Sequence, residues 1–400
     1  MRILKKSSVA VFVLSILAML CTSCTTSTSA EECWIGTWIS AQQLAESHNT
    51  PPSPYLANNT LRQVVYATLG GSRIRVQFSN KYSNGPITIN SAHIAVSTGG
   101  SSINTETDTA LTFGGSSSVT IPAGDEIYSD TVDFKVEPLS NLAVSIYFGE
   151  ASSTNVTGHP GSRTTSYIKT GNAVSTNFTP DGSKANWWIL SGIDVWLDDS
   201  YACIVTLGDS ITDGRGSTTD KNNRWPDNLA RRLQANPDTA KIGVLNQGVG
   251  GNTIVSGGLG VTALKRFDHD VLDPNGVRWV IILEGVNDIG NSRNPRIAEQ
   301  VIAAYEEFIE KAHAKNIKVY GVPILPFMGS QYRNETARQT INEWIRTSGK
   351  FDAVIDLDEA VRDPENPSRL LREYDSGDHL HLSVAGLQKM ADAIDLDLFK

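Results

Sequence analysis

The stretch Val205-Thr206-Leu207-Gly208-Asp209-Ser210-Ile211-Thr212-Asp213-Gly214 decides the fold of the second half of this 400-residue chain. An apolar run stops there at small, polar residues that favour turns, which is typical of a buried strand reaching the edge of a sheet. Open α/β sheets place their ligands outside the carboxyl ends of their strands. Ser210 is therefore a candidate nucleophile, although a serine without partners at this place would be an ordinary turn residue.

The residues around this stretch alternate between strand and helix patterns. Strands are expected over 201–207, 241–246, 277–284, 317–323 and 353–356, and helices over 225–235, 261–272, 295–315, 334–348 and from about 383. The run Trp279-Val280-Ile281-Ile282-Leu283 is apolar on both faces, which indicates a parallel sheet covered by helices. We predict a doubly wound, parallel α/β domain over residues 199–400.

Residues 34–196 follow a different pattern. Arg62–Thr68 and Arg73–Phe78 alternate polar and apolar residues on either side of Gly70-Gly71, which predicts a hairpin with one buried face. Similar short runs, bounded by Gly, Ser, Asn or Pro, recur without a helical period. We predict an all-β sandwich domain over residues 31–198.

Each of three segments could have either a functional or a purely structural role. We favour a solvated turn for His159-Pro160-Gly161-Ser162-Arg163 over a loop that leans across a neighbouring active site. Trp187 and Trp188 are expected in the sandwich core rather than on a sugar-stacking surface, because Trp is highly buried on average. The polar segment Arg215–Lys221 is either part of a leaving-group site or a mobile connection, and the sequence leaves both open.

Residues 1–30 resemble a secretory signal peptide. A basic start is followed by the apolar run Val9–Leu20 and by the small residues Thr28-Ser29-Ala30, which suit cleavage. Cys24 follows small residues of the kind that precede a lipidated cysteine, so a lipid anchor at Cys24 is the alternative to soluble release. The protein is expected outside the cytoplasm, either secreted or as a lipoprotein of the cell envelope.

Two cysteines remain after the signal region. If the protein is secreted, Cys33 and Cys203 lie in an oxidising compartment, where disulfides persist. Cys203 stands within an apolar strand pattern, so a free buried thiol is as compatible with the sequence as a Cys33–Cys203 disulfide.

The chain is acidic. Its 34 Lys and Arg residues and 43 Asp and Glu residues give a formal net charge of −9. The cations form no stripe, which argues against nucleic acid as a partner.

Further polar residues follow the other strands of the predicted parallel sheet. The second strand ends at Gly248-Val249-Gly250-Gly251-Asn252, and the third ends at Glu284-Gly285-Val286-Asn287-Asp288. Asp378 and His381 lie in the last polar loop, spaced so that a tight turn can return the carboxylate to the imidazole Nδ1–H. Because parallel strands end at one edge of the sheet, these groups should surround Ser210.

Acyl transfer requires this set of groups. A serine hydroxyl is a weak nucleophile until an imidazole accepts its proton, and the imidazole needs a carboxylate that fixes its tautomer. The negative charge of the tetrahedral intermediate needs preorganised donors, and losing one of them costs on the order of 3 kcal/mol. The N–H groups of Ser210 and Gly251 and the amide of Asn287 could supply three.

These residues resemble a known family. Gly208-Asp209-Ser210, Gly251, Gly285-x-Asn287-Asp288 and Asp378-x-x-His381 are similar to the four motif blocks of the SGNH hydrolase superfamily, the GDSL-type esterases and lipases. The four blocks stand in the expected order within a region from about 203 to 396. In the second block Gly250 is the alternative to Gly251, one position away.

The resemblance implies both a fold and roles. It implies a flavodoxin-like sheet of five parallel strands, with Ser210 as nucleophile, His381 as base, Asp378 as its orienting partner, and Gly251 and Asn287 as oxyanion donors. The Trp-Ile-Gly-Thr-Trp start at Trp34 and the sandwich more loosely resemble the N-terminal half of a secreted bacterial subgroup of these hydrolases.

Other chemistries fit the sequence less well. His379 is the competitor of His381, and the two together could be metal ligands, but no third ligand with a fitting spacing is evident. Asp209, Asp213 and Asp288 could be interpreted as a glycosidase pair. We favour Asp209 as the cap of the turn and Asp288 as the residue that holds the loop after Asn287 by side-chain to backbone hydrogen bonds.

The sequence thus predicts a secreted serine esterase that hydrolyses carboxylic esters through an acyl-enzyme, without a metal or organic cofactor. Short acyl groups, above all acetyl groups on an extracellular polysaccharide, are the preferred substrate. A lipase or longer-chain acyl esterase is the alternative among enzymes. A non-catalytic carbohydrate-binding surface protein is the alternative of another class.

Overall fold

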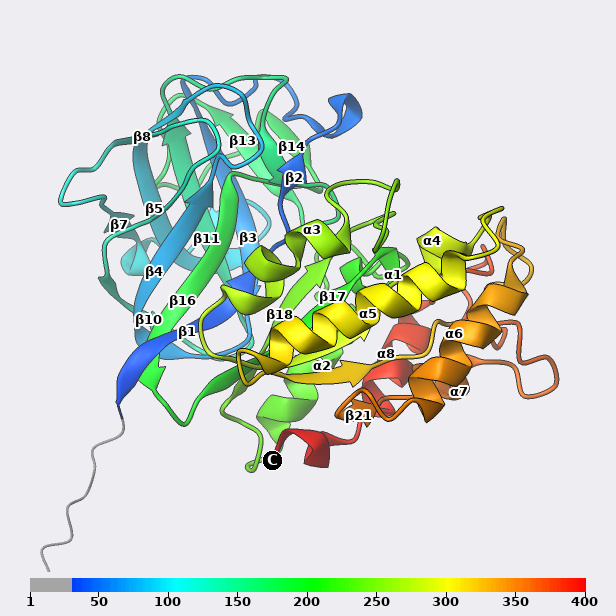
Figure 1. The fold of residues 1–400 in the computed structure, drawn as a ribbon. Helices are drawn as coiled ribbons and strands as arrows, with labels where there is room; N and C mark the ends of the chain where they lie inside the picture. Colours follow the sequence, from blue (N-terminus) through cyan, green and yellow to red (C-terminus); the bar gives the residue numbers. More distant parts are fainter. Residues whose placement is uncertain (1–30) are drawn as a thin grey trace, which may run out of the picture.

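The computed structural model describes residues 31–400. The predicted signal peptide and Cys24, the site of the alternative lipid anchor, lie outside the described residues. Within them, an all-β part and an α/β part lie side by side (Figure 1). We call residues 31–198 the β region and residues 199–400 the α/β region. Between residues 31 and 400, no helix combines the length and the apolar character that a membrane span requires.

The β region consists of three antiparallel sheets. The first contains, in spatial order, β1 (Glu32–Ile39), β16 (Leu190–Asp198), β4 (Gly71–Ser79) and β10 (Val132–Val136), with β9 (Glu126–Tyr128) also beside β4. The second contains β14 (Gly182–Lys184), β13 (Ser166–Thr170), β3 (Asn59–Ala67), β11 (Ser140–Phe148), β5 (Ile87–Gly99) and β6 (Ser102–Ile103), with β7 (Thr109–Leu111) and β8 (Val119–Ile121) against β5. The third is β15 (Trp187–Trp188), β12 (Thr157–His159) and β2 (Gln43–Leu44).

The predicted hairpin across Gly70-Gly71 is wrong. Both strands exist, but β3 pairs with β11 and β13 whereas β4 pairs with β16, β10 and β9, so they belong to different sheets. Alternation of polar and apolar residues tells which face of a strand is buried, not which strand lies beside it. At Gly70 the chain changes sheets, as consecutive strands of a sandwich often do.

The α/β region confirms the predicted fold class. Its five strands are all parallel and lie in the order β18 (Ile242–Gly248), β17 (Ala202–Gly208), β19 (Val277–Leu283), β20 (Lys318–Gly321), β21 (Ala353–Val354). Counted along the chain this is the order 2-1-3-4-5 of flavodoxin-like sheets. The apolar run of Val280 and its neighbours forms β19, which is buried on both faces as its sequence predicted.

Helices cover both faces of this sheet. The apolar side chains of α2 (Trp225–Ala235), α7 (Leu357–Val361) and α8 (Val384–Asp392) pack on one face. Those of α3 (Ala263–Phe267), the π-helical turn η3 (Asp268–Leu272), α5 (Ile297–His313) and α6 (Glu335–Thr347) pack on the other. The sheet's carboxyl edge therefore stays free for the loops that carry the polar residues.

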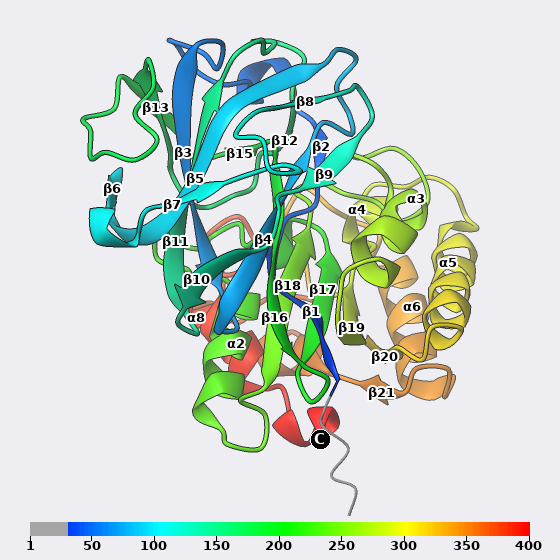
Figure 2. The same ribbon diagram turned by 90° about the vertical axis from the view of Figure 1, so that its left-hand side faces the viewer.

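One hydrophobic core joins the two regions. The same cluster of buried side chains contains Val76 and Trp187 of the β region and Val205 and Leu245 of the parallel sheet. β1 runs beside the edge strand β18 (Figure 2), and the Val244 N–H of that strand donates to Thr68 Oγ1 at 3.1 Å. The β region thus covers an edge that would otherwise expose unpaired backbone groups.

The structure decides two questions that the sequence left open: whether Cys33 and Cys203 form a disulfide, and whether Trp187 and Trp188 are buried. Among residues 31–400 both Cys33 and Cys203 are free thiols, and Cys203 Sγ donates to the Gly36 carbonyl at 2.9 Å. Trp187 and Trp188 are 2% and 0% exposed, which confirms their place in the core.

Candidate active site

The nucleophile candidate stands at the start of a one-turn helix, α1 (Ser210–Asp213), that follows β17 directly. Asp209 caps this helix, as predicted, because its carboxylate accepts the Ile211 N–H at 2.9 Å. Gly214 ends it with a φ of 94°, a left-handed conformation that suits glycine. Ser210 occupies the first helical position, where the backbone N–H has no acceptor inside the helix.

Ser210, His381 and Asp378 are brought together in the predicted order. Ser210 Oγ lies 2.8 Å from His381 Nε2, and His381 Nδ1 lies 2.7 Å from Asp378 Oδ2. The other oxygen of Asp378 accepts the backbone N–H groups of His381 at 2.8 Å and Leu380 at 3.1 Å. The tight turn expected from the spacing of Asp378 and His381 is thus present, and it fixes the carboxylate against the imidazole.

The charges of this pair suit a general base. Burial lowers the pKa of His381, the hydrogen bond and charge of Asp378 raise it, and the positive charges of Arg215 and Arg163 lower it, so that it lies below its ordinary 6.5. Burial raises the pKa of Asp378, but the hydrogen bonds from His381 lower it more, to about 2. At neutral pH the imidazole is therefore uncharged, with Nδ1–H donating to the carboxylate and Nε2 free to accept the Ser210 proton.

His379, the competitor of His381, does not contact Ser210. Its Nδ1 faces Asp375 Oδ2 at 2.5 Å, and its side chain is 51% exposed. Within residues 31–400, no three His, Cys, Asp or Glu side chains are grouped so that they could hold a metal ion.

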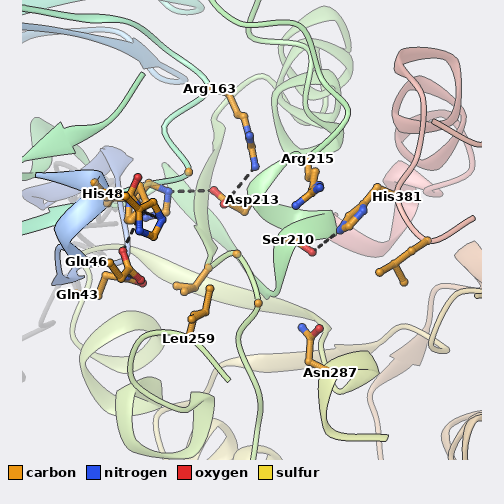
Figure 3. Close-up of a pocket in the computed structure, with 18 of the residues that line it drawn as sticks. Gln43, Glu46, His48, Arg163, Ser210, Asp213, Arg215, Leu259, Asn287 and His381 are labelled. Atoms are coloured by element: carbon orange, nitrogen blue, oxygen red, sulfur yellow. Dashed lines mark hydrogen bonds and ion pairs between the residues drawn. The ribbon is translucent and has the colours of Figure 1, made fainter. Parts of the chain in front are cut away.

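Asn287 lies across from Ser210 (Figure 3), and both residues line the cavity. Asn287 lies on the one-turn helix α4 (Val286–Ile289); its Nδ2 donates to the Asn252 carbonyl at 2.7 Å, and its Oδ1 accepts the Tyr332 hydroxyl at 2.6 Å. Gly250 and Gly251 both line the cavity, and no hydrogen bond within residues 31–400 uses either N–H. Tyr332, which orients the amide, had no signal in the sequence.

Asp288 holds a different loop from the one predicted. Its carboxylate accepts the N–H groups of Ile254 at 2.8 Å and Val255 at 2.9 Å, and so ties α4 to the loop after β18. Burial raises the pKa of Asp288 to about 6, and burial and neighbouring carboxylates raise that of Asp209 to about 7. A glycosidase pair is not evident, because Asp209 and Asp288 are engaged with backbone N–H groups and do not line the cavity. Asp213 does line the cavity, where His159 and Arg163 contact it.

Arg266 binds the carboxyl ends of two strands, and no sequence motif predicted this role. It is 2% exposed, and its guanidinium donates to the carbonyls of Gln247 at 2.8 Å and Gly208 at 3.2 Å. It also donates to Asn252 Oδ1 at 3.0 Å and to Asp270 Oδ2 at 2.8 Å. Arg266 therefore joins the ends of β17 and β18 to the loop that carries the glycines.

The cavity in front of Ser210 has a volume of about 460 Å³ and two walls (Figure 3). The α/β wall consists of the residues described above, and the β wall comes from the β region. The side chains that form the β wall are those of Gln43, Glu46, His48, Asn49, His159 and Arg163.

The segment around His159 is not a solvated turn. His159 is 4% exposed, with Nδ1 2.7 Å from the Ala41 carbonyl and Nε2 2.9 Å from Asp213 Oδ1. A Cβ added at Gly161 would lie 1.7 Å from Asp213 Oδ2, so the loop packs directly on α1. The composition suited a surface turn, but the surface it covers is the nucleophile helix of the other region.

The segment after Arg215 also contacts the β region. Asp220 accepts the Thr165 N–H at 2.6 Å and the Thr165 hydroxyl at 2.8 Å, and its own N–H donates to the Arg163 carbonyl at 2.9 Å. Arg215 is exposed and lines the cavity.

Comparisons with known proteins extend this picture. Residues 206–389 match the GDSL-like Lipase/Acylhydrolase family. No curated protein sequence matches the chain. Similar solved structures include a lipase/acylhydrolase from Enterococcus faecalis, with 22% identity, 48% of this chain and 92% of that chain covered, and a TM-score of 0.38. An acetyl xylan esterase has 22% identity, coverage of 48% and 96%, and a TM-score of 0.37. A carbohydrate acetylesterase from Sinorhizobium meliloti has 14% identity, coverage of 48% and 95%, and a TM-score of 0.37.

The matched residues begin within β17 and end within α8, so they span the parallel sheet and every predicted motif block. This confirms the resemblance on which the sequence interpretation rested. Residues 206–389 are therefore identified as a GDSL-like lipase/acylhydrolase domain, and the protein is a carboxylic ester hydrolase.

Proposed function

We propose that the protein is a secreted serine esterase that removes short acyl groups, above all acetyl, from an extracellular polysaccharide. The observation that carries the proposal is the chain of contacts from Ser210 Oγ through His381 to Asp378, at the inner end of a mostly polar cavity. Secretion rests on the signal-like pattern of residues 1–30, and a lipid anchor at Cys24 is its variant.

The reaction proceeds in two steps. Ser210 Oγ attacks the ester carbonyl while His381 Nε2 takes its proton, and Asp378 stabilises the resulting imidazolium. His381 then gives this proton to the departing alcohol, which leaves an acyl group on Ser210. A water molecule, deprotonated by the same imidazole, attacks the acyl-enzyme and releases the acid, and the proton returns to Ser210.

The oxyanion of each tetrahedral intermediate needs donors on the side opposite the base. The Ser210 N–H, the Gly251 N–H and Asn287 Nδ2 fill this role, because all three residues line the cavity. Gly250 is the neighbour that could replace Gly251. Asn287 is preorganised, since contacts with Asn252 and Tyr332 fix its amide before any substrate binds.

The cavity lining favours a small acyl group and a hydrophilic alcohol. Aliphatic side chains contribute little to it beyond Val249, Leu259 and Leu380. Each methylene of a long acyl chain gains about 0.8 kcal/mol only when it reaches an apolar surface. Hydroxyl groups of a sugar, in contrast, find hydrogen-bonding partners on the β wall.

The proposal is tested by an acyl-chain panel with a matched polymer assay. We expect 4-nitrophenyl acetate to be hydrolysed with a much higher kcat/KM than the decanoate, and acetate to be released from acetylated xylan or pectin. A clear preference for decanoate would instead indicate a lipase.

Covalent labelling by a fluorophosphonate probe addresses the nucleophile. The wild type and the Ser118→Ala control, whose exposed serine lies in the β region, should label, and Ser210→Ala should not. If the wild type remains unlabelled and inactive, the non-catalytic carbohydrate-binding alternative gains support.

A further inference from the structure

Two guanidinium groups border the cavity on the side of the base (Figure 3). Arg163 comes from the loop between β12 and β13, and Arg215 from the turn after α1. The Arg215 N–H donates to the Ser210 carbonyl at 2.8 Å, so its backbone is fixed one helical turn from the nucleophile. Both positive charges act on His381, because each lowers the pKa of that imidazole.

The protein engages these two cations only in part. Arg215 forms no ion pair and no side-chain hydrogen bond within residues 31–400. Arg163 approaches only Asp213, at 3.9 Å, and the other oxygen of that carboxylate is already bound by His159. The Nε of Arg163 is buried without an acceptor. Arg266 and the equally buried Arg338, in contrast, each have several oxygen acceptors.

The backbone of Arg163 is held in an unfavourable conformation. Its φ of 50° lies in the left-handed region, which residues with a Cβ rarely adopt. The Asp220 N–H donates to its carbonyl at 2.9 Å, and Asp220 is itself bound to Thr165. Strain of this kind persists only where the surroundings impose it, and it is frequent at ligand sites.

The opposite end of the cavity carries an anion that is already engaged. Glu46 accepts hydrogen bonds from Gln43 Nε2 at 2.6 Å and Asn49 Nδ2 at 2.9 Å. In Figure 3 it lies across the cavity from the two arginines. Near Ser210 and His381 the cavity is therefore lined by two arginines and one carboxylate, that of Asp213, while the β wall is rich in hydrogen-bonding groups. This excess of positive charge stands inside a chain whose formal charge is −9.

We propose that Arg163 and Arg215 form a carboxylate-binding subsite, so that this esterase prefers anionic esters over neutral esters of the same shape. This inference rests on the proposed function and specifies its substrate. Guanidinium groups bind carboxylates through paired, charge-assisted hydrogen bonds. The carboxylate could belong to the alcohol, as in an acetylated uronic acid of a polysaccharide, or to the acyl group, as in a half-ester of a dicarboxylic acid.

Two matched substrate pairs distinguish these sources. The first compares an O-acetylated methyl galacturonoside with its methyl ester, which lacks the charge on the alcohol. The second compares mono-4-nitrophenyl succinate with 4-nitrophenyl butyrate, which lacks the charge on the acyl group. We expect the wild type to show about a tenfold or greater advantage in kcat/KM for the charged member of one pair.

Variants assign this advantage to the two arginines. Arg163→Gln and Arg215→Gln should each remove most of it while hydrolysis of the neutral ester persists. Arg372→Gln, at an exposed arginine outside the cavity, is the matched control and should keep it. Because Arg215 is exposed, the advantage should also shrink when salt is raised from low to about 0.5 M, whereas turnover of the neutral ester should not change in parallel.

The outcomes separate this inference from the function on which it rests. Equal kcat/KM within both pairs, or an advantage that survives in both arginine variants, would overturn the carboxylate subsite and leave the esterase standing. Failure of the wild type to hydrolyse any of the four esters would overturn both.

Discussion

The α/β wall and the β wall of the cavity differ in how they are built. The α/β wall contains Ser210 and Asn287 on one-turn helices that follow β17 and β19, and His381 in the loop before α8. The β wall contains His159 and Arg163 on a loop that reaches across to α1. The difference teaches that one region supplies all the reacting groups of the proposed mechanism, whereas both regions set the shape and charge of the cavity.

Two histidines, one from each wall, give the largest expected contrast. His381→Ala removes the base, so kcat should fall at least about a thousandfold on a neutral acetyl ester. His159→Gln removes a partner of Asp213 but no reacting group, and should lower kcat/KM by roughly tenfold at most. Steady-state kinetics on both variants provides the test. A loss at His159 as large as that at His381 would mean that the β wall takes part in the chemistry itself.

Asn287 tests the oxyanion side of the α/β wall. Asn287→Ala removes one donor, and we expect kcat to fall by about a hundredfold to a thousandfold with little change in KM, because the donor acts mainly in the transition state. Tyr332→Phe leaves the amide in place but frees it to rotate, so its effect should be smaller and again in kcat. If Asn287→Ala instead changed only KM, the amide would be a substrate-binding group.

Gly161 tests how closely the β wall must fit the nucleophile helix. Gly161→Ala forces Asp213 away from the loop, and overpacking of this kind costs about 1–3 kcal/mol of stability. Displacement of α1 should also lower kcat by roughly tenfold through misplacement of Ser210. Gly85→Ala is the control, since a Cβ there meets nothing within 4 Å. Urea unfolding and steady-state kinetics should show a lower stability and a lower kcat for Gly161→Ala than for Gly85→Ala. Equal values for the two variants would mean that the loop adjusts to the added methyl group without displacing α1.

The same contrast explains what the sequence could predict. Apolar runs such as Trp279–Leu283 are long and unambiguous, and α2 begins and ends where its pattern indicated. Ser210 and Asn287 stand directly after β17 and β19, so their meeting at one edge follows from the parallel topology. His381 lies in the loop before α8, well after the last strand, and was expected there from its spacing to Asp378 and from the family resemblance.

The β wall could not be predicted in the same way. Alternation in β3 and β4 fixed their buried faces, yet the strands lie in different sheets. The loop from His159 to Arg163 is polar because it meets Asp213 and the cavity, and a solvated turn has the same composition. Arg266 lies within the helical pattern before η3, where nothing distinguishes a buried, fully bonded arginine from a surface one.

The pH dependence of kcat/KM tests how the positive charges of Arg215, on the α/β wall, and Arg163, on the β wall, lower the pKa of His381. Because His381 must be uncharged to accept the Ser210 proton, kcat/KM for a neutral ester should rise with pH through a midpoint below 6.5. Arg215→Gln and Arg163→Gln each remove a positive charge that lowers this pKa, so the midpoint should move to higher pH in both. A midpoint that moves to lower pH, or moves in neither variant, would contradict the placement of these charges beside the base.

A second contact between the regions lies outside the lining of the Ser210 cavity. His269 of η3 bridges Glu126 of β9 at 2.8 Å and its neighbour Asp270 at 2.7 Å, and Asp270 binds Arg266. Burial lowers the pKa of His269, but the hydrogen bonds to Asp270 and Glu126 raise it more, to about 9. Burial raises the pKa of Glu126, but the hydrogen bond from His269 contributes to a net value below the ordinary 4.5.

The pH dependence of unfolding should reveal this contact. Because the pKa of His269 is raised on folding, its charge stabilises the protein fully below pH 6.5, and this stabilisation is lost as the pH rises through about 9. The contribution is at most about 3 kcal/mol, since one pKa unit corresponds to about 1.4 kcal/mol. In urea unfolding at pH 6, 8 and 10, His269→Gln should flatten the decline, whereas His313→Gln, at an exposed pair with Asp352 inside the α/β region, should not. If the decline persists in His269→Gln, the two regions are held together by their shared apolar core without help from this ion pair.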